Sequence, residues 1–191
     1  MLLIALQIAP LATALLCWLA PRARSREWLN VAGAAATLLL ALAVLARVMG
    51  EGPQLEAWDS LYADALSAYM AVTIAAVGFA AALFSVGYMR SDLAAGHVPD
   101  GESGLRWYYL VFHLFIWTML ATVMVNSLGL LWVGIEATTL ASALLVGFYR
   151  GKAALEAAWK YLVLCTVGIT IALFGVVLTY LAASEGGVAS L

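Results

Sequence analysis

Charged side chains are scarce in this sequence. Lys, Arg, Asp and Glu make up 10 % of the 191 residues, and hydrophobic residues make up 65 %. An ordinary soluble domain carries about 25 % charged and roughly 45–50 % apolar residues. A chain with so few polar groups cannot cover a water-facing surface, which excludes soluble enzymes and disordered regulators. The net charge of −2 also excludes the basic surface with which proteins bind nucleic acid.

Residues that hold cofactors are also few. The sequence has two cysteines and two histidines, which is too few cysteines for the ligand set of an iron–sulfur cluster. It contains no GxGxxG motif, no P-loop and no His/Cys cluster with metal-ligand spacing. We therefore expect no catalytic residue, cofactor site or metal site in the chain. Cys17 and Cys165 are interpreted as packing residues, and Gly168 and Gly175 as positions of close helix packing.

Six long apolar segments are present instead. A helix needs about 20 apolar residues to cross the hydrocarbon core of a bilayer. Proline- and glycine-containing turns separate most of the segments, whereas only Asn126 and Ser127 separate the fourth from the fifth, which predicts a tight helical hairpin. No segment alternates apolar and polar residues as a barrel strand does. The sequence predicts an all-α membrane protein with six transmembrane helices at residues 2–20, 29–49, 65–89, 107–125, 128–149 and 157–181.

Basic residues predict the orientation of these helices. Arg47 lies near Glu51, Glu56 and Asp59, on the side opposite to most of the Lys and Arg residues. Positive charge marks cytoplasmic loops, so we expect a multi-pass protein of the inner (plasma) membrane with its N-terminus outside. The first apolar segment is followed rather than preceded by arginines, which favours a retained helix over a cleaved signal peptide. The basic residues on the predicted cytoplasmic side are Arg22, Arg24, Arg26, Arg90, Arg106, Arg150 and Lys152, and the interfacial tryptophans are Trp18, Trp28, Trp58 and Trp107.

One acid lies far from every predicted loop. Glu136 is about 12 Å from the start of the fifth predicted helix and about 20 Å from its end. A charged side chain near the centre of a bilayer costs about 2.5–3.5 kcal/mol on insertion scales, and it normally faces protein or a water-filled path. We therefore interpret Glu136 as a proton-transfer residue. The alternative is a protonated structural acid that bonds a neighbouring helix.

Lys160 and His113 are further proton-transfer candidates. Lys160 begins the sixth predicted helix, and Glu156 is placed to pair with it, so a lysine that snorkels to the membrane edge is an equal alternative. About 15 Å of predicted depth separates Lys160 from Glu136, so water or other polar groups would have to connect the two. His113 can shuttle protons, but we favour a hydrogen bond across a helix interface.

Other polar residues have supporting interpretations. Thr138 and Thr139 follow Glu136 and are expected to provide hydrogen bonds between helices and to support a file of water. Asp59 and Asp64 precede the third predicted helix, where an acid interacts favourably with the helix N-terminus, so capping is the expected role.

Three segments resemble one family of membrane proteins. NSLGLLWVGIEATTL at residues 126–140 is similar to the fifth-helix signature of the antiporter-like subunits of respiratory complex I and membrane-bound hydrogenases. The segment at residues 155–168, LEAAWKYLVLCTVG, resembles the next helix, and its residues are most similar to those of the F-subunit branch of hydrogenase-4. LYADALSAYM at residues 61–70 and FSVGYM at residues 84–89 resemble the third helix. The motifs occur in the family's order, and the resemblance extends over essentially the whole chain.

The resemblance implies a non-catalytic, proton-translocating subunit of a hydrogenase-type or NADH:quinone oxidoreductase-type complex. Glu136 would be the protonatable residue, Lys160 would belong to the hydrophilic axis, and Asp64 would be a structural or access residue. The chain would comprise a three-helix region at 1–90, a cytoplasmic loop at 91–106, and the start of the proton-translocating module at 107–191. Family members have two inverted repeats, so we expect this chain to be an N-terminal part and to be inactive alone.

Alternative functions remain open on the sequence. A subunit of a cation/proton antiporter or of an ion-coupled inorganic-carbon transporter is built from the same module. A purely structural membrane subunit is a third possibility. The expected partners are other membrane subunits of the assembly, the lipid bilayer and the transported protons, and nucleic acid is not among them.

Overall fold

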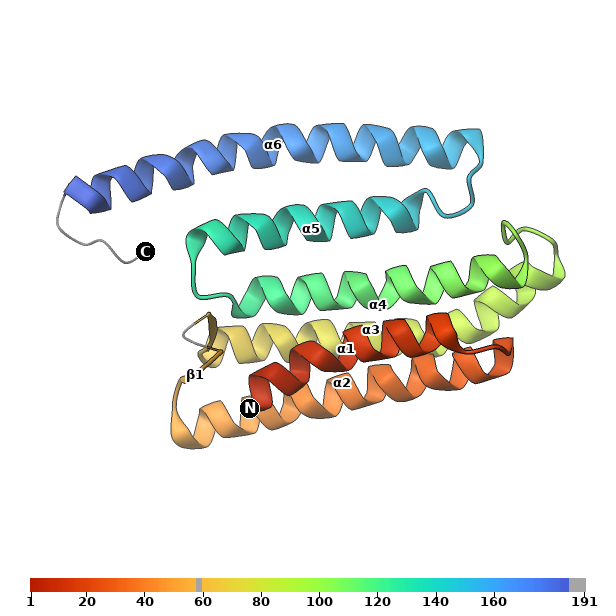
Figure 1. Ribbon diagram of the computed structural model, residues 1–191, viewed down its shortest axis with the longest axis horizontal. Helices are drawn as coiled ribbons and strands as arrows, with labels where there is room; N and C mark the ends of the chain where they lie inside the picture. The colour runs from red at the N-terminus through yellow and green to blue at the C-terminus, as the bar shows by residue number, and fades with distance from the viewer. Residues whose placement is uncertain (58–59, 186–191) are drawn as a thin grey trace.

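The fold is a bundle of long helices (Figure 1). The computed structural model describes residues 1–57 and 60–185, so Trp58 and Asp59, with their predicted interfacial and capping roles, lie outside the described residues. In the described part, six helices are long and apolar enough to cross a membrane, which confirms the predicted fold class. They are α1 (Leu2–Leu19), α2 (Ala23–Glu51), α3 (Ala65–Ala94), α4 (Glu102–Met124), α5 (Leu128–Val146) and α6 (Lys152–Glu185).

Several helices extend beyond their predicted bounds. α2 begins six residues earlier than predicted, α3 ends at Ala94, and α4 begins at Glu102, so the predicted loop at 91–106 shrinks to residues 95–101. α6 likewise begins at Lys152 rather than at residue 157. Hydropathy marks the part of a helix that lies in hydrocarbon, whereas backbone hydrogen bonding continues into charged residues at the interface. The predicted tight turn between α4 and α5 is confirmed.

A short β-hairpin, which the sequence analysis did not predict, connects α2 to α3. Its strands β1 (Gln54–Glu56) and β2 (Leu61–Ala63) are antiparallel and are too short to give a periodic signal. The Glu56 carboxylate accepts hydrogen bonds from the backbone amides of Leu2, at 2.9 Å, and Ile4, at 3.3 Å. These amides have no partner within α1, so the hairpin caps the first helix.

The first four helices form a cluster, and the last two are added to it one after the other (Figure 1). α1, α2, α3 and α4 pack against one another, α5 packs on α4, and α6 packs on α5. None of the described residues of α6 is buried. A Cβ atom added at Gly168 or Gly175 would meet nothing within 4 Å, so the predicted close packing at these glycines is not found among the described residues.

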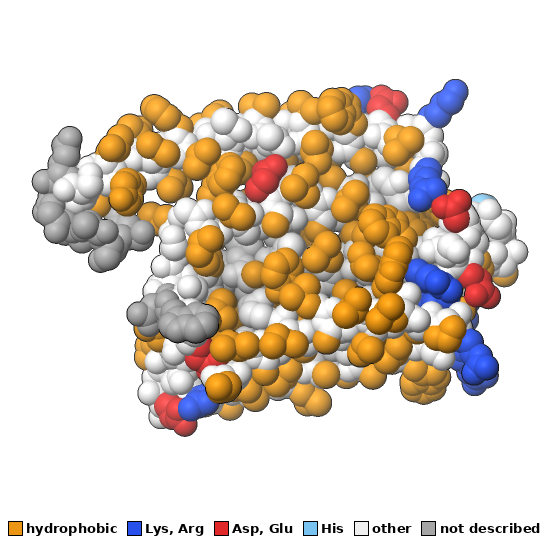
Figure 2. Space-filling view, viewed as in Figure 1, with side chains coloured by type: hydrophobic (Ala, Val, Ile, Leu, Met, Phe, Trp, Pro, Cys, Tyr) orange, Lys and Arg blue, Asp and Glu red, His pale blue; other side chains and the backbone are white. Residues whose placement is uncertain are grey.

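Basic side chains gather at one end of the bundle, where the connections after α1, α3 and α5 also lie (Figures 1 and 2). We call this the basic end, defined by Arg22, Arg24, Arg90, Arg106, Arg150 and Lys152. Arg26 falls between the predicted helices at residues 2–20 and 29–49, and the structure shows that this position is wrong. Arg26 lies in the first turn of α2, is 0 % exposed, and donates to the backbone oxygens of Ala20, Pro21 and Glu102.

Candidate functional site

Glu136 occupies the middle of α5. It follows Leu128 by eight residues and precedes Val146 by ten, which is about 12 Å and about 15 Å along the helix axis. Thr166 of α6 donates from Oγ1 to Glu136 Oε1 at 3.4 Å. The other carboxyl oxygen, Oε2, is buried and finds no hydrogen-bond partner among the described residues. Figure 2 shows acidic atoms on the visible face between α5 and α6, flanked by hydrophobic side chains and away from both charged ends.

Two further hydrogen bonds set the register of α5 against α6. The indole nitrogen of Trp132 donates to the backbone oxygen of Ile169 at 2.8 Å, and the Ser142 hydroxyl bonds the Tyr161 hydroxyl at 3.0 Å. These bonds lie on either side of the Glu136–Thr166 contact. The sequence analysis did not single out Thr166, although a hydroxyl in an otherwise apolar helix segment is the kind of signal that could have found it.

Lys160 does not reach Glu136. It is exposed and forms an i,i+4 ion pair with Glu156. Because it precedes Thr166 by six residues, about 9 Å of helix rise separates it from the level of Glu136, rather than the predicted 15 Å. The difference arises because α6 begins at Lys152, which places Lys160 more than two turns inside the helix.

Thr138 and Thr139 line a mostly apolar groove. Their hydroxyls donate to the backbone oxygens of Gly134 and Ile135 in their own helix, at 2.9 and 3.1 Å. Both residues line a groove of about 230 Å³ between α3, α4 and α5, together with Thr122 of α4. A hydroxyl that donates to its own helix still offers lone pairs, so the three threonines supply the few hydrogen-bond acceptors of a groove that Glu136 itself does not line.

Asp64 and His113 lie away from Glu136. Asp64 is the N-cap of α3, and its Oδ1 accepts from the Ser67 amide at 2.8 Å, as the capping interpretation predicts. This hydrogen bond holds the pKa of the Asp64 carboxyl below its ordinary value. His113 is 0 % exposed, and its Nε2 lies 3.0 Å from Oδ1 of Asn30 on α2. The structure therefore turns His113 toward α2, in the cross-helix hydrogen bond that the sequence analysis favours.

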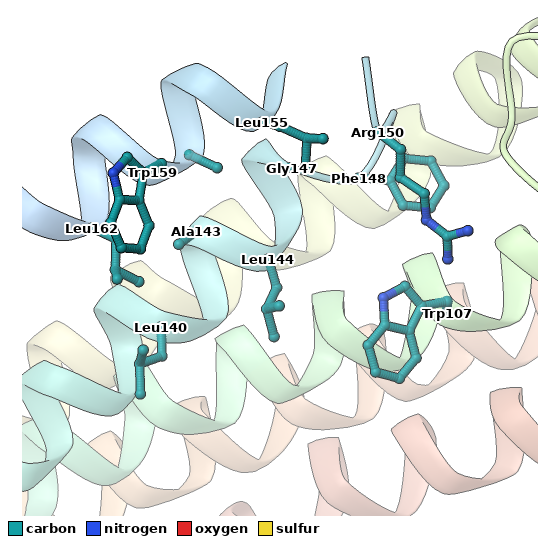
Figure 3. A pocket seen from close by; sticks show the side chains of 11 residues that line it. Trp107, Leu140, Ala143, Leu144, Gly147, Phe148, Arg150, Leu155, Trp159 and Leu162 are labelled. Carbon is teal, nitrogen blue, oxygen red and sulfur yellow. The ribbon is translucent and has the colours of Figure 1, made fainter. Parts of the chain in front are cut away.

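A larger groove near the basic end is mostly apolar. It has a volume of about 610 Å³ and lies between α4, α5 and α6. Figure 3 shows Trp107 and Arg150 at one end of it and Trp159 and Leu162 of α6 at the other. Its charged residue, Arg150, is paired with Asp100 at 2.7 Å. Neither Glu136 nor Lys160 lines this groove.

Two family models match the sequence. One, described as NADH-Ubiquinone oxidoreductase (complex I), chain 5 N-terminus, matches residues 55–95. The other, described as NADH:quinone oxidoreductase/Mrp antiporter, TM, matches residues 125–191, which include the Glu136–Thr166 contact. The chain is thus similar to antiporter-like membrane subunits over two separate segments.

The similar proteins are named as components or subunits of different assemblies. A hydrogenase-4 component F homolog of Methylacidiphilum infernorum is 41 % identical over 56 % of this chain and 22 % of the relative. NADH-quinone oxidoreductase subunit L of Pseudomonas aeruginosa is 38 % identical over 51 % of this chain and 15 % of the relative. Na(+)/H(+) antiporter subunit A1 of Staphylococcus haemolyticus is 31 % identical over 64 % and 14 %. The chain thus matches about a fifth or less of the length of these antiporter-like relatives.

Proposed function

We propose that this chain is a proton-translocating subunit of a hydrogenase-4-like or complex-I-like membrane assembly, in which Glu136 takes up and releases the transported proton. The names of the relatives, which are components of hydrogenase-4 and of NADH-quinone oxidoreductase, support this proposal. The observation that carries it is the Glu136 carboxyl, which lies in the middle of α5 with one oxygen buried and unpartnered among the described residues. Partner subunits in the membrane would supply the redox energy.

Polar residues around Glu136 suggest how a proton would reach it. The groove lined by Thr122, Thr138 and Thr139 offers hydroxyl acceptors on the α4 side of α5. On the α6 side, Thr166 donates to the carboxyl, and Lys160 lies about 9 Å farther toward the basic end. The Lys160 ammonium group is paired with Glu156 in the structure. In this proposal it must leave Glu156 before it can interact with Glu136.

The test replaces Glu136 in the assembled complex and measures proton transport and redox turnover in membrane vesicles. Glu136→Gln keeps the shape of the side chain but cannot exchange a proton, so proton transport should fall about a hundredfold or more, the size expected for losing an acid–base group. Glu136→Asp is the matched control and should retain part of the transport. Full transport and full coupled turnover in a correctly assembled Glu136→Gln complex would overturn the proposed role.

A cation/proton antiporter subunit is the second candidate. The match to the Na(+)/H(+) antiporter subunit A1 favours it. The two functions differ in what drives the proton. In a redox-coupled complex, electron donor addition should acidify or alkalinise vesicles without sodium, whereas an antiporter should move protons when a sodium gradient is imposed and no donor is present.

The orientation is also part of the proposal. We infer that the basic end faces the cytoplasm of a cell whose inner (plasma) membrane holds the protein, because cytoplasmic loops are enriched in Lys and Arg. Single cysteines at Ala95, near the basic end, and at Leu55 in β1 test this in a background that lacks Cys17 and Cys165. An impermeant thiol reagent should modify Leu55→Cys in intact cells and Ala95→Cys only in inverted vesicles. The opposite pattern would reverse the inferred orientation.

A further inference from the structure

A second set of polar side chains is buried between α2, α3 and α4, away from Glu136. On α4, Arg106, Tyr109 and His113 are spaced at i, i+3 and i+7, which places them on one face of the helix. The set spans about 10 Å of helix rise from the basic end. Tyr109 is 1 % exposed and His113 is 0 % exposed, so this stripe faces protein.

The partners of His113 define which ring nitrogen carries the proton. Asn30 donates from Nδ2 to the backbone oxygen of Ala82 at 3.0 Å and to the Ser85 hydroxyl at 3.2 Å. A backbone carbonyl only accepts, so this bond fixes the orientation of the amide and turns Asn30 Oδ1 toward His113 Nε2, at 3.0 Å. The neutral His113 ring therefore donates from Nε2 and has its acceptor lone pair on Nδ1.

Each residue of the α4 stripe has a polar atom that is buried and has no hydrogen-bond partner among the described residues. These atoms are Arg106 Nε, the Tyr109 hydroxyl and His113 Nδ1. Leaving a buried polar group unpaired is costly, and native proteins commonly satisfy such groups with internal water. Donors and acceptors spaced one helical turn apart are suited to a chain of water molecules, because water both donates and accepts.

Pockets at the basic end come close to this stripe, since Leu105, next to Arg106, lines one of them and Val31, next to Asn30, lines the other. Glu27 of α2 and Arg90 of α3 form an ion pair in which Arg90 is 61 % exposed and Glu27 only 10 % exposed. Two open pockets, of about 570 and 290 Å³, flank this pair, and Arg24, Glu27 and Arg90 line both. The pair thus stands at the boundary between the aqueous surface and the interface that holds Asn30 and Ser85.

We propose that α2, α3 and α4 enclose a hydrated inlet, which admits water from the basic end past Tyr109 as far as His113. Its ligand is water, held by the Tyr109 hydroxyl and by His113 Nδ1. The inlet places a titratable ring in contact with the aqueous phase at one end of the bundle. It is separate from the Glu136 site, which lies between α5 and α6, and it does not depend on the proposed proton transport.

Cysteine accessibility tests the inlet in the full chain in membrane vesicles, with Cys17→Ala and Cys165→Ala as background. Ser85→Cys is nearly isosteric and lies at the end of the inlet, whereas Ala75→Cys is equally buried but about 15 Å farther along α3. A small charged methanethiosulfonate needs water and a thiolate, so it should modify Ser85→Cys at least roughly tenfold faster than Ala75→Cys. Equal rates would overturn the proposal.

Hydroxyl-radical footprinting tests the same point without substitutions. Radicals generated from water oxidise side chains that contact internal water. Tyr109 should therefore be oxidised faster than Phe112, which is also aromatic and, at 8 % exposed against 1 %, is more accessible from outside. If Phe112 is oxidised and Tyr109 is not, the interface is dry and the inlet does not exist.

Discussion

Single polar side chains hold this apolar bundle together by hydrogen bonds between helices. Asn30 is the clearest case, because its amide has partners on both α3 and α4. Thr37, two turns along the same face of α2, is equally buried but bonds only the backbone oxygen of Gly33 in its own helix. Asn30 forms three hydrogen bonds to other helices, whereas the Thr37 bond lies within α2, so the two residues should differ strongly in their contribution to stability.

Asn30→Asp is expected to destabilise the fold by roughly 1–3 kcal/mol, the cost of leaving buried groups unpaired. A carboxylate has no hydrogen to donate, so it loses the bonds that Asn30 Nδ2 donates to the Ala82 oxygen and to the Ser85 hydroxyl. Thr37→Val, the matched control, keeps the shape and should change the free energy of unfolding much less. Reversible unfolding in mixed micelles measures both values. Equal losses for the two variants would show that the Asn30 network adds nothing specific.

Asp64→Ala removes the N-cap of α3 and should lower the free energy of unfolding by about 0.5–2 kcal/mol at neutral pH. Asp64→Asn, which can still accept from the Ser67 amide, should cost less. Because the Asp64 pKa is lowered in the folded chain, the carboxylate stabilises the fold above its ordinary pKa of 3.8, and this contribution is lost as the pH falls through the lower folded value. Unfolding titrations at decreasing pH should therefore show the wild-type advantage over Asp64→Ala shrinking below about pH 4.

At the scale of elements, one close approach positions the helix that carries Glu136. A Cβ atom built on Gly134 of α5 would lie 2.5 Å from Oγ1 of Thr122 on α4 and 3.2 Å from its Cα. Only glycine lets the two helices meet at this distance. Gly134 precedes Glu136 by two residues, so the spacing of α4 and α5 also determines where the carboxyl lies relative to α6.

Gly134→Ala should push α5 from α4 and destabilise the fold by about 1–3 kcal/mol, the usual cost of overpacking. Adding Thr122→Ala removes the nearest atom and should restore part of the loss. Gly129→Ala is the control, since its nearest neighbour would be Ser127 Oγ at 3.8 Å. The measurements are unfolding free energy and proton transport in the assembled complex. A Gly134→Ala variant as stable as Gly129→Ala would argue against a close α4–α5 contact.

Sequence patterns predicted the elements well and their contacts less well. Hydropathy located six helices and the Asn126–Ser127 turn, because each depends on local composition. It missed the ends of α2 and α6, where helices continue into charged residues, and it therefore misjudged the depth of Lys160. It identified Glu136 as the intramembrane acid, but the contact with Thr166 depends on helix register, which a single sequence does not reveal.

At the scale of the whole molecule, the burial of side chains decreases from the α1–α4 cluster toward α6. α4 contacts helices on both sides, whereas none of the described residues of α6 is buried. The Glu136–Thr166 contact therefore joins α5, which packs on α4, to a poorly covered helix.

Hydrogen exchange should reproduce this gradient. For the 191-residue chain in lipid nanodiscs, amides in α6 should exchange faster than those in α4, because local opening of α6 breaks few packing contacts. Mass spectrometry of peptides from Lys152–Glu185 and Glu102–Met124 gives the two rates. The same comparison in the assembled complex reports whether another subunit covers α6. Equal protection of both helices in nanodiscs would contradict the packing described above.

Arg26 bears on two successive steps, the insertion of the first helices into the membrane and the later packing of α4. While the first two helices enter the membrane, its charge counts with those of Arg22 and Arg24 and helps to retain their connection on one side. Once α4 arrives, the same guanidinium is enclosed and bonds the main chain of Ala20, Pro21 and Glu102. A lysine would keep the charge but not the planar fork that reaches three carbonyls. Membrane topology and helix packing can thus be separated at this one position. Arg26→Lys keeps the positive charge that directs insertion and removes the hydrogen bonds that join α2 to α4.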